Sequence, residues 1–164
     1  MLLVKDEAQI AAKQILETKW NGTFPVDPVK IAGSLGIDVK TATFRDAGTS
    51  GAIIANSPQD VTIYVAASES LPRQTFTCAH EIGHFIERGT AKDPEYSFVE
   101  NRTTSYDLHE FFADEFAGNL LMPEKQFVAL WKSEASLSTI ANFFAVSYGA
   151  TEHRLKRLRR ERKL

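Results

Sequence analysis

Residues 73–89 read RQTFTCAHEIGHFIERG and contain the pentad His-Glu-Ile-Gly-His, in which His80 and His84 are four positions apart. The pattern around the pentad is helical, and we expect a helix over residues 71–88. Residues four apart lie one turn apart on the same face of a helix, so both imidazoles can bind one metal ion. Gly83 would let another backbone pack closely beneath this face. The pentad therefore predicts a helix that carries a metal site.

Glu81 lies about 100° around this helix from His80, because an α-helix has 3.6 residues per turn. Its carboxylate would then lie beside the metal, in a position that suits a general base acting on water there. We predict that Glu81 is the catalytic base. The simpler alternative is a surface helix with two solvated histidines.

A catalytic zinc site takes three protein ligands and keeps one position open. The metzincin pattern would need Gly and His at the positions of Glu87 and Thr90, so it does not apply. Cys78, the only cysteine, lies two residues before His80 on the same helix and cannot reach around to the metal. Cys78 is expected to be a small buried residue. The third ligand should therefore come from the next helix.

That next helix is expected over residues 107–121, which read DLHEFFADEFAGNLL. Glu110 and Asp114 are four apart and flank its apolar stripe, where a neighbouring helix would pack. We predict that Glu110 is the third ligand and that Asp114 accepts the free N–H of a ligating histidine. The alternative is that Glu110 only forms a capping box with Asp107, and that Asp114 is solvated.

The order of elements predicts an α+β fold that is mainly helical, with a small antiparallel sheet of about three strands. Together with the pentad and Glu110, this suggests a minimal thermolysin-like metallopeptidase core. We expect residues 1–135 to form this domain and residues 136–164 to form a helical pair, packed on it or semi-independent. The expected helices are 5–19, 27–36, 71–88, 107–121, 124–132 and two from 138 onward; the expected strands are 37–44 and two within 50–67, followed later by a polar connector at 89–106.

The C-terminal pair has the rhythm of a helix-turn-helix, with a turn near residues 146–147. Residues 154–164 hold seven Lys or Arg and one Glu, although the net charge of the chain is −2. Such a basic segment can contact nucleic acid, or it can be a solvated helix end. The alternative function is therefore a DNA-binding regulator with the metal site as a sensor, in which phosphates would be contacted by Arg154, Lys156, Arg157 and Arg159.

Targeting signals are absent from the sequence as given. The N-terminus is charged within six residues, no apolar run approaches the length of a membrane span, and a single cysteine allows no internal disulfide. We expect a cytoplasmic protein.

Two stretches carry specific motifs. RQTFTCAHEIGH at 73–84 matches Arg-x-x-Phe-Thr-x-Ala-His-Glu-x-Gly-His, and EFFADEFAGNLLMP at 110–123 matches Glu-x-x-Ala-(Asn or Asp)-x-Phe-Ala-x-x-Leu-Leu-Met-Pro. Weaker similarity lies in FPVDPVKIAGSLGIDV at 24–39 and FFAVSYGATEHRLKRL at 143–158. In this order and over nearly the whole chain, they resemble the ImmA/IrrE family of metallopeptidases.

The resemblance implies a zinc-dependent endopeptidase with His80, His84 and Glu110 as ligands and Glu81 as base. It further implies that the substrate is a helix-turn-helix repressor of a mobile element or stress regulon, cleaved to regulate transcription. A His-His-Glu site would also accept Mn²⁺ or Fe²⁺. The ending RRERKL is more basic than is usual in the family.

Two further parts of a peptidase site have candidates. The oxyanion needs one donor besides the metal, and the candidates are Tyr96, Tyr106, His109 and His153. The strand near Thr62–Ala66 would pair with an extended substrate by strand addition, unless it is an interior strand.

Overall fold

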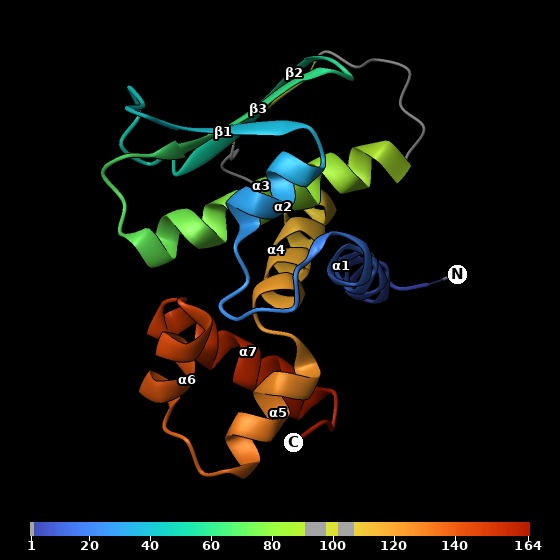
Figure 1. Cartoon of the computed structure of the whole chain (residues 1–164), viewed down its shortest axis with the longest axis vertical. Coiled ribbons are helices and arrows are strands. Elements are labelled where there is room, and N and C mark those ends of the chain that lie inside the picture. Colours follow the sequence, from blue (N-terminus) through green and yellow to red (C-terminus); the bar gives the residue numbers. More distant parts are fainter. Residues whose placement is uncertain (1, 91–97, 102–106) are drawn as a thin grey trace.

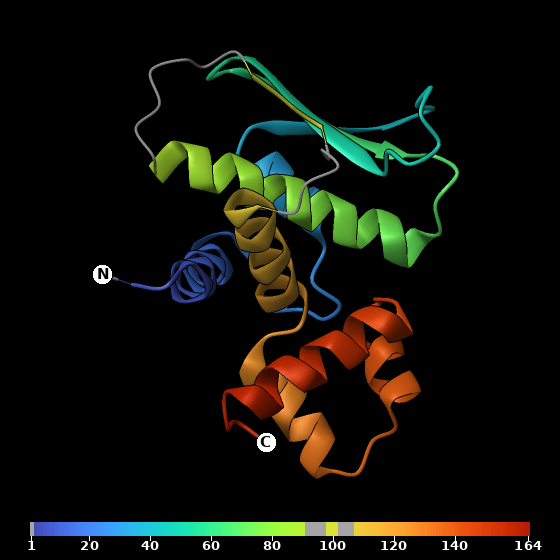
Figure 2. The same ribbon diagram turned by 180° about the vertical axis from the view of Figure 1, so that it is seen from behind.

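The pentad helix is the central element of the fold. It is α3 (Leu71–Thr90), which runs beneath the sheet, while α4 (Leu108–Leu121) crosses below α3 with α1 (Val4–Lys19) at its side (Figure 1, Figure 2). The computed structural model describes residues 2–90, 98–101 and 107–164. The helices and strands within these residues confirm the expected mainly helical α+β fold. The other elements are α2 (Pro28–Ser34), β1 (Ile37–Ala42), β2 (Gly51–Ser57), β3 (Asp60–Ala66), β4 (Phe98–Asn101), α5 (Glu124–Lys132), α6 (Leu137–Phe144) and α7 (Tyr148–Arg160).

The sheet is mixed, which corrects the expectation of a purely antiparallel one. Its strand order is β1-β3-β2-β4, and β3 is antiparallel to β2 but parallel to β1. The reason is that the β2–β3 hairpin folds back so that β3 enters between β1 and β2. Ile63 of β3 then pairs with both Val39 and Ile53, and Ile53 and Ile63 are fully buried.

A fourth strand was missed by the sequence patterns. β4 lies inside the expected polar connector and pairs antiparallel with β2, from Ala52 to Ala55. A strand of four residues is too short to show an alternating pattern, and it exists by pairing with a partner that is distant in sequence. β1 and β4 therefore form the two edges of the sheet, and β3 is interior.

Helices α3 and α4 cross at Gly83. A Cβ at this position would lie 3.0 Å from Ala113 Cα and 3.2 Å from a ring carbon of Phe116, and both of these residues are fully buried. The absence of a side chain lets the two backbones approach closely, as the sequence predicts. Glu110 lies about one turn before Ala113, so this close crossing brings its carboxylate to the histidines of α3.

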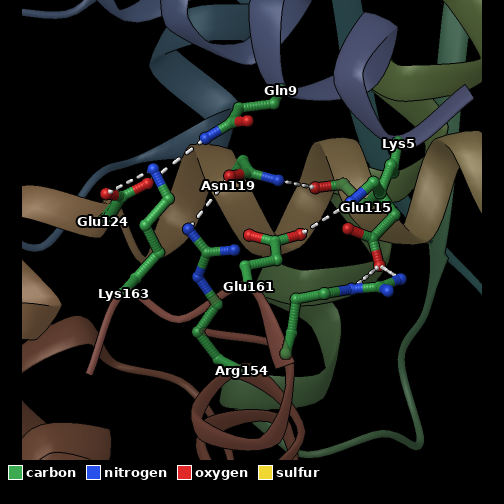
Figure 3. A network of polar contacts seen from close by, with 9 residues as sticks. Lys5, Gln9, Glu115, Asn119, Glu124, Arg154, Glu161 and Lys163 are labelled. Atoms are coloured by element: carbon green, nitrogen blue, oxygen red, sulfur yellow. Dashed lines mark hydrogen bonds and ion pairs between the residues drawn. The ribbon is translucent and has the colours of Figure 1, made fainter. Parts of the chain in front are cut away.

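A buried arginine joins the C-terminal helices to α4. Arg154 of α7 is 5% exposed; its Nε donates to the Met122 carbonyl at 3.1 Å and its Nη2 donates to Asn119 Oδ1 at 2.9 Å (Figure 3). One turn further on, Arg157 Nε donates to Glu115 Oε1 at 2.8 Å. A buried charge is tolerated only when it is hydrogen-bonded. These bonds therefore fix α7 against α4.

Weaker polar contacts surround this anchor (Figure 3). Lys5 of α1 lies 3.7 Å from Glu161, and Glu124 of α5 is 3.4 Å from Lys163 and 3.3 Å from the Gln9 amide that donates to it. Such partly exposed pairs contribute little to stability individually. They connect α1, α5 and the chain end around the buried arginine.

The turn between α6 and α7 matches the helix-turn-helix rhythm. Ala145 takes a left-handed conformation (φ 53°) at the end of α6, and the Ser147 side chain caps α7 by accepting from the Ala150 N–H.

The phosphate contact expected of Arg154 is wrong, because its guanidinium is buried and hydrogen-bonded inside the protein. The division into two domains at residue 135 stays a prediction.

The described helices include none that is long and apolar enough to cross a bilayer.

Gly83→Ala should destabilise the protein. The added methyl group meets backbone and an aromatic ring, so overpacking of about 1–3 kcal/mol should exceed the helix-propensity gain of about 1 kcal/mol. Urea unfolding measures the change. Gly118→Ala in α4 is the matched control, because a Cβ there meets nothing within 4 Å; it should be neutral or stabilising by up to about 1 kcal/mol. Equal effects of the two variants would contradict the close crossing.

Candidate metal centre

The two histidines of the pentad face each other inside the protein. His80 is 0% and His84 is 3% exposed, and their Nε2 atoms are 3.0 Å apart. Neither is a solvated surface residue, so the alternative of a surface helix is wrong. The four-residue spacing on α3 has placed both imidazoles on the same buried face.

Glu110 from α4 joins the pair. One carboxylate oxygen lies 3.4 Å from His80 Nε2 and the other lies 3.2 Å from His84 Nε2. The N-terminus of α4 is capped by Asp107, whose side chain accepts from the N–H groups of His109 and Glu110. Capping is therefore done by Asp107, while the Glu110 carboxylate is directed at the histidines.

His80, His84 and Glu110 form a cluster whose ligand atoms all lie within 4.8 Å of one another, so these residues could hold a metal ion. In a tetrahedral zinc site with ligands at about 2.0–2.1 Å, neighbouring ligand atoms are about 3.3 Å apart. The two histidine nitrogens, 3.0 Å apart, and the two Glu110 oxygens, 3.4 and 3.2 Å from His80 and His84 respectively, are separated by distances of that size. Two nitrogens and a carboxylate oxygen are also a donor set that zinc prefers.

Asp114 contacts the first candidate ligand. Its Oδ1 lies 2.8 Å from His80 Nδ1, one turn along α4 from Glu110. A proton on Nδ1, donated to this carboxylate, leaves the Nε2 lone pair facing the cluster, which is the tautomer that a metal requires. The geometry thus agrees with the position predicted for Asp114.

The two imidazoles differ in their affinity for a proton. Burial lowers the pKa of His80, but hydrogen bonds to Asp114 and Glu110 outweigh it and raise the pKa to about 9. Burial, together with the charge of His80, lowers the pKa of His84 to about 4. Two positive charges cannot be held 3 Å apart in a buried site. Without metal, the pair therefore carries one positive charge near neutral pH, and that charge lies on His80.

Glu81 lies on the sheet side of α3 and is 1% exposed. A Cβ at Gly51, the first residue of β2, would lie 3.2 Å from Glu81 Oε1 and 2.3 Å from the Thr77 methyl carbon. Gly51 therefore makes room for Glu81 and Thr77. Sequence reasoning missed Gly51, because a glycine at a strand end can equally mark a bulge or a bend of the chain.

The remaining candidates from the sequence are placed as follows. Cys78 is 1% exposed, and burial, followed by the charges of Asp27 and Glu81, raises its pKa to about 12. The prediction of a buried structural cysteine is confirmed. His109 Nδ1 lies 3.1 Å from Glu87 Oε2, between α4 and α3.

His153 is on α7 and lines a cleft that also includes Asp114. Tyr96 and Tyr106 lie outside the described residues. Strand addition at Thr62–Ala66 is wrong, because β3 is interior and its backbone is already paired on both sides.

The fold and the cluster together define a class: a helical α+β protein with a His-Glu-x-x-His helix and a glutamate from the next helix, as in metallopeptidases. A family model of M78 peptidases, described as the IrrE N-terminal-like domain, matches residues 32–156. The chain belongs to this family.

Comparison with solved structures shows the same fold in a protein described as a Mycobacterium tuberculosis transcriptional regulator. The TM-score is 0.62 at 18% identity, and the match covers 93% of this chain and 50% of that one. The chain thus spans about half the length of this structural relative. Among curated proteins, no significant match was found.

Glu110→Ala should abolish metal binding, because it removes one of three ligands. Elemental mass spectrometry of the purified wild type should give about one zinc ion per chain, and the variant should have lost it. Glu115→Ala, on the same helix but outside the cluster, is the control and should keep the metal. A wild type without metal after reconstitution with zinc would mean that the cluster is structural.

In metal-free protein, Asp114→Asn should be destabilising by about 1–3 kcal/mol at pH 6, because it weakens a hydrogen bond to a charged imidazole. His80 has a raised pKa, so its contribution to stability is complete below the unfolded-state value of 6.5 and is lost as the pH rises through about 9. The difference between variant and wild type should therefore shrink between pH 6.5 and 9. Urea unfolding across that range tests this, and a difference that grows with pH would contradict it.

Proposed function

We propose that the chain is a zinc-dependent endopeptidase that hydrolyses a peptide bond in a regulatory protein. The observation that carries the proposal is the buried cluster of His80, His84 and Glu110 with Glu81 in the same pentad, in a chain of a peptidase family. Three ligands leave a fourth position open, as hydrolytic zinc sites require.

The roles of the chain's own residues follow from their positions. His80, His84 and Glu110 would hold the ion, and Asp114 keeps His80 in the ligating tautomer. When bound, zinc supplies Lewis acidity that polarises a carbonyl and makes water more acidic. Mn²⁺ or Fe²⁺ would suit the same donors.

Glu81 acts as the general base in this proposal. Its charge contributes to the raised pKa of His80, so the carboxylate lies close to the cluster without being part of it. It takes a proton from the attacking water and delivers it to the leaving nitrogen. Its buried position against Gly51 restricts the carboxylate to that side of α3.

The substrate we propose is a helix-turn-helix repressor of a mobile element or stress regulon, cleaved in the cytoplasm so that its genes are expressed. This part is supported by the resemblance to ImmA/IrrE peptidases and by family membership. DNA binding by the chain itself has less support. Of the four basic residues proposed to contact phosphates, Arg154 is buried and Arg157 is bonded to Glu115.

Glu81→Gln should lower hydrolysis by about 10²- to 10⁴-fold while keeping the metal, because only the general base is lost. The two zinc-loaded proteins would be incubated with lysate of the source cells, and new protein N-termini identified by mass spectrometry. We expect new N-termini within a helix-turn-helix protein from the wild type only.

Metal content of both proteins is the control, since equal zinc excludes loss of the site. Glu110→Ala is a second variant that we expect to be inactive, because it lacks one proposed ligand but keeps Glu81. Identical sets of N-termini from wild type and Glu81→Gln would overturn the proposed mechanism.

A further inference from the structure

A cleft of about 590 Å³ opens between the first half of α3, the length of α4, and α7. Its floor is apolar, and includes the half-buried rings of Phe76 and Phe111 and the side of Met122. Neither the proposed metal ligands nor Glu81 line it. The peptidase chemistry therefore does not account for this hollow.

The shape of the cleft fits an extended chain. On α7 the lining runs from Gly149 to Arg160, and along α4 it runs from Phe111 to Met122, the residue that ends the helix. Each wall is about 15 Å long, at 1.5 Å per helical residue. An extended peptide rises about 3.3 Å per residue, so about four or five residues would fill the cleft.

The charge of the lining is positive. Four arginines face two carboxylates, Asp114 and Glu115, an excess of two positive charges. Glu115 accepts from Arg157, whose guanidinium also lies 5.3 Å from the centre of the Phe111 ring. Arg154 is bonded only to a carbonyl and an amide oxygen among the described residues, so its charge is not neutralised by a direct carboxylate partner.

The rim carries the cations that an incoming ligand would meet. Arg160 is exposed and makes no ion pair within the described chain, and His153, about two turns earlier on α7, is also exposed. Across the cleft, Arg73 of α3 has a loose contact of 3.9 Å with Glu69, and both side chains are partly exposed. Arginine binds carboxylates with paired N–H donors.

We propose that this cleft is a docking site for an acidic segment of the protein substrate, about four or five residues long, with an aromatic or aliphatic side chain on Phe76 and Phe111. That the bound segment belongs to a substrate rests on the proposed peptidase function. Apolar floor and basic rim together favour a peptide over duplex DNA, because the bases of a duplex are stacked inside it and its phosphate backbone has no apolar group to cover the rings.

The cleft adjoins the proposed metal centre at one residue. Asp114 lines the cleft and its Oδ1 also lies 2.8 Å from His80 Nδ1. A segment docked between α4 and α7 would therefore pass close to His80 where it meets Asp114. It would keep the rest of the substrate near the cluster, which raises the local concentration of the scissile bond.

Fluorescence anisotropy tests the proposal with a fluorescein-labelled peptide, Asp-Glu-Phe-Glu-Asp, and its amide counterpart, Asn-Gln-Phe-Gln-Asn. The protein is the full zinc-loaded chain carrying Glu81→Gln, so binding is measured without hydrolysis and does not depend on activity. The acidic peptide should bind at least about tenfold more tightly than the amide peptide, the factor for one charge-assisted hydrogen bond, and binding should weaken with salt.

Arg160→Glu, in the same background, should weaken binding of the acidic peptide by at least about tenfold. Arg159→Glu is the matched control: it reverses the same charge on the neighbouring residue, which lies 5.1 Å over the Trp131 ring and does not line the cleft. It should have a much smaller effect. Arg73→Glu supplies a second test from α3, and should weaken binding as Arg160→Glu does.

Circular dichroism of each variant confirms that it is folded before binding is compared. Equal affinity for the acidic and amide peptides, or equal effects of Arg160→Glu and Arg159→Glu, would overturn the proposal. Competition by a short DNA duplex would also overturn it, if the duplex displaces the peptide and its binding is weakened by Arg160→Glu and Arg73→Glu. The cleft would then belong to a phosphate-binding surface.

Discussion

The close crossing of α3 and α4 is the constraint on which the metal centre depends. Two of the three potential ligands come from one helix and the third from the other, so the distances from Glu110 to the two histidines are set by the distance between helix axes. Gly83 against Ala113 allows backbone contact at that point. Local helical geometry then positions everything else: His84 follows His80 by one turn, and Asp114 follows Glu110 by one turn. A widening of the crossing by a fraction of an ångström would lengthen both distances between Glu110 and the histidines.

The cluster is also an electrostatic compromise. Burying two imidazoles and a carboxylate side by side is unfavourable unless the charges balance. In metal-free protein a proton shared by the histidines provides that balance, with His80 favoured by Asp114 and Glu110 and His84 held neutral. A divalent ion on these donors would replace this proton with a larger charge. Metal affinity and folding stability are therefore coupled through the same few side chains.

Sequence patterns were most informative where structure is local. The pentad, Glu110 and Asp114 were found because helix periodicity relates residues one turn apart, and most helix and strand bounds follow from caps and breakers such as Asp27, which accepts from the Val29 and Lys30 N–H groups. Pairing between distant segments was not accessible in this way. The parallel β1–β3 ladder and β4 depend on how the hairpin folds back, which no short pattern records.

Arg154 and Gly51 show why single residues mislead. Within the basic C-terminal segment Arg154 looked like a residue for phosphate, yet it is buried because Asn119 and the end of α4 offer acceptors far away in sequence. The importance of Gly51 depends on the Thr77 methyl group, 26 positions further on, which a Cβ would overlap. Such roles depend on tertiary contacts, and neither residue type nor spacing predicts them.

The burial of Cys78 has a consequence for the redox chemistry of the protein. Nucleophilic attack, oxidation and soft-metal binding all require a thiolate, and a thiol with a pKa of about 12 and 1% exposure supplies almost none at neutral pH. The chain's only sulfhydryl is thus inert, although it lies two residues before a proposed metal ligand. Peroxide or disulfide stress would leave this helix chemically unchanged. A redox signal would have to act on a part of the chain other than this thiol.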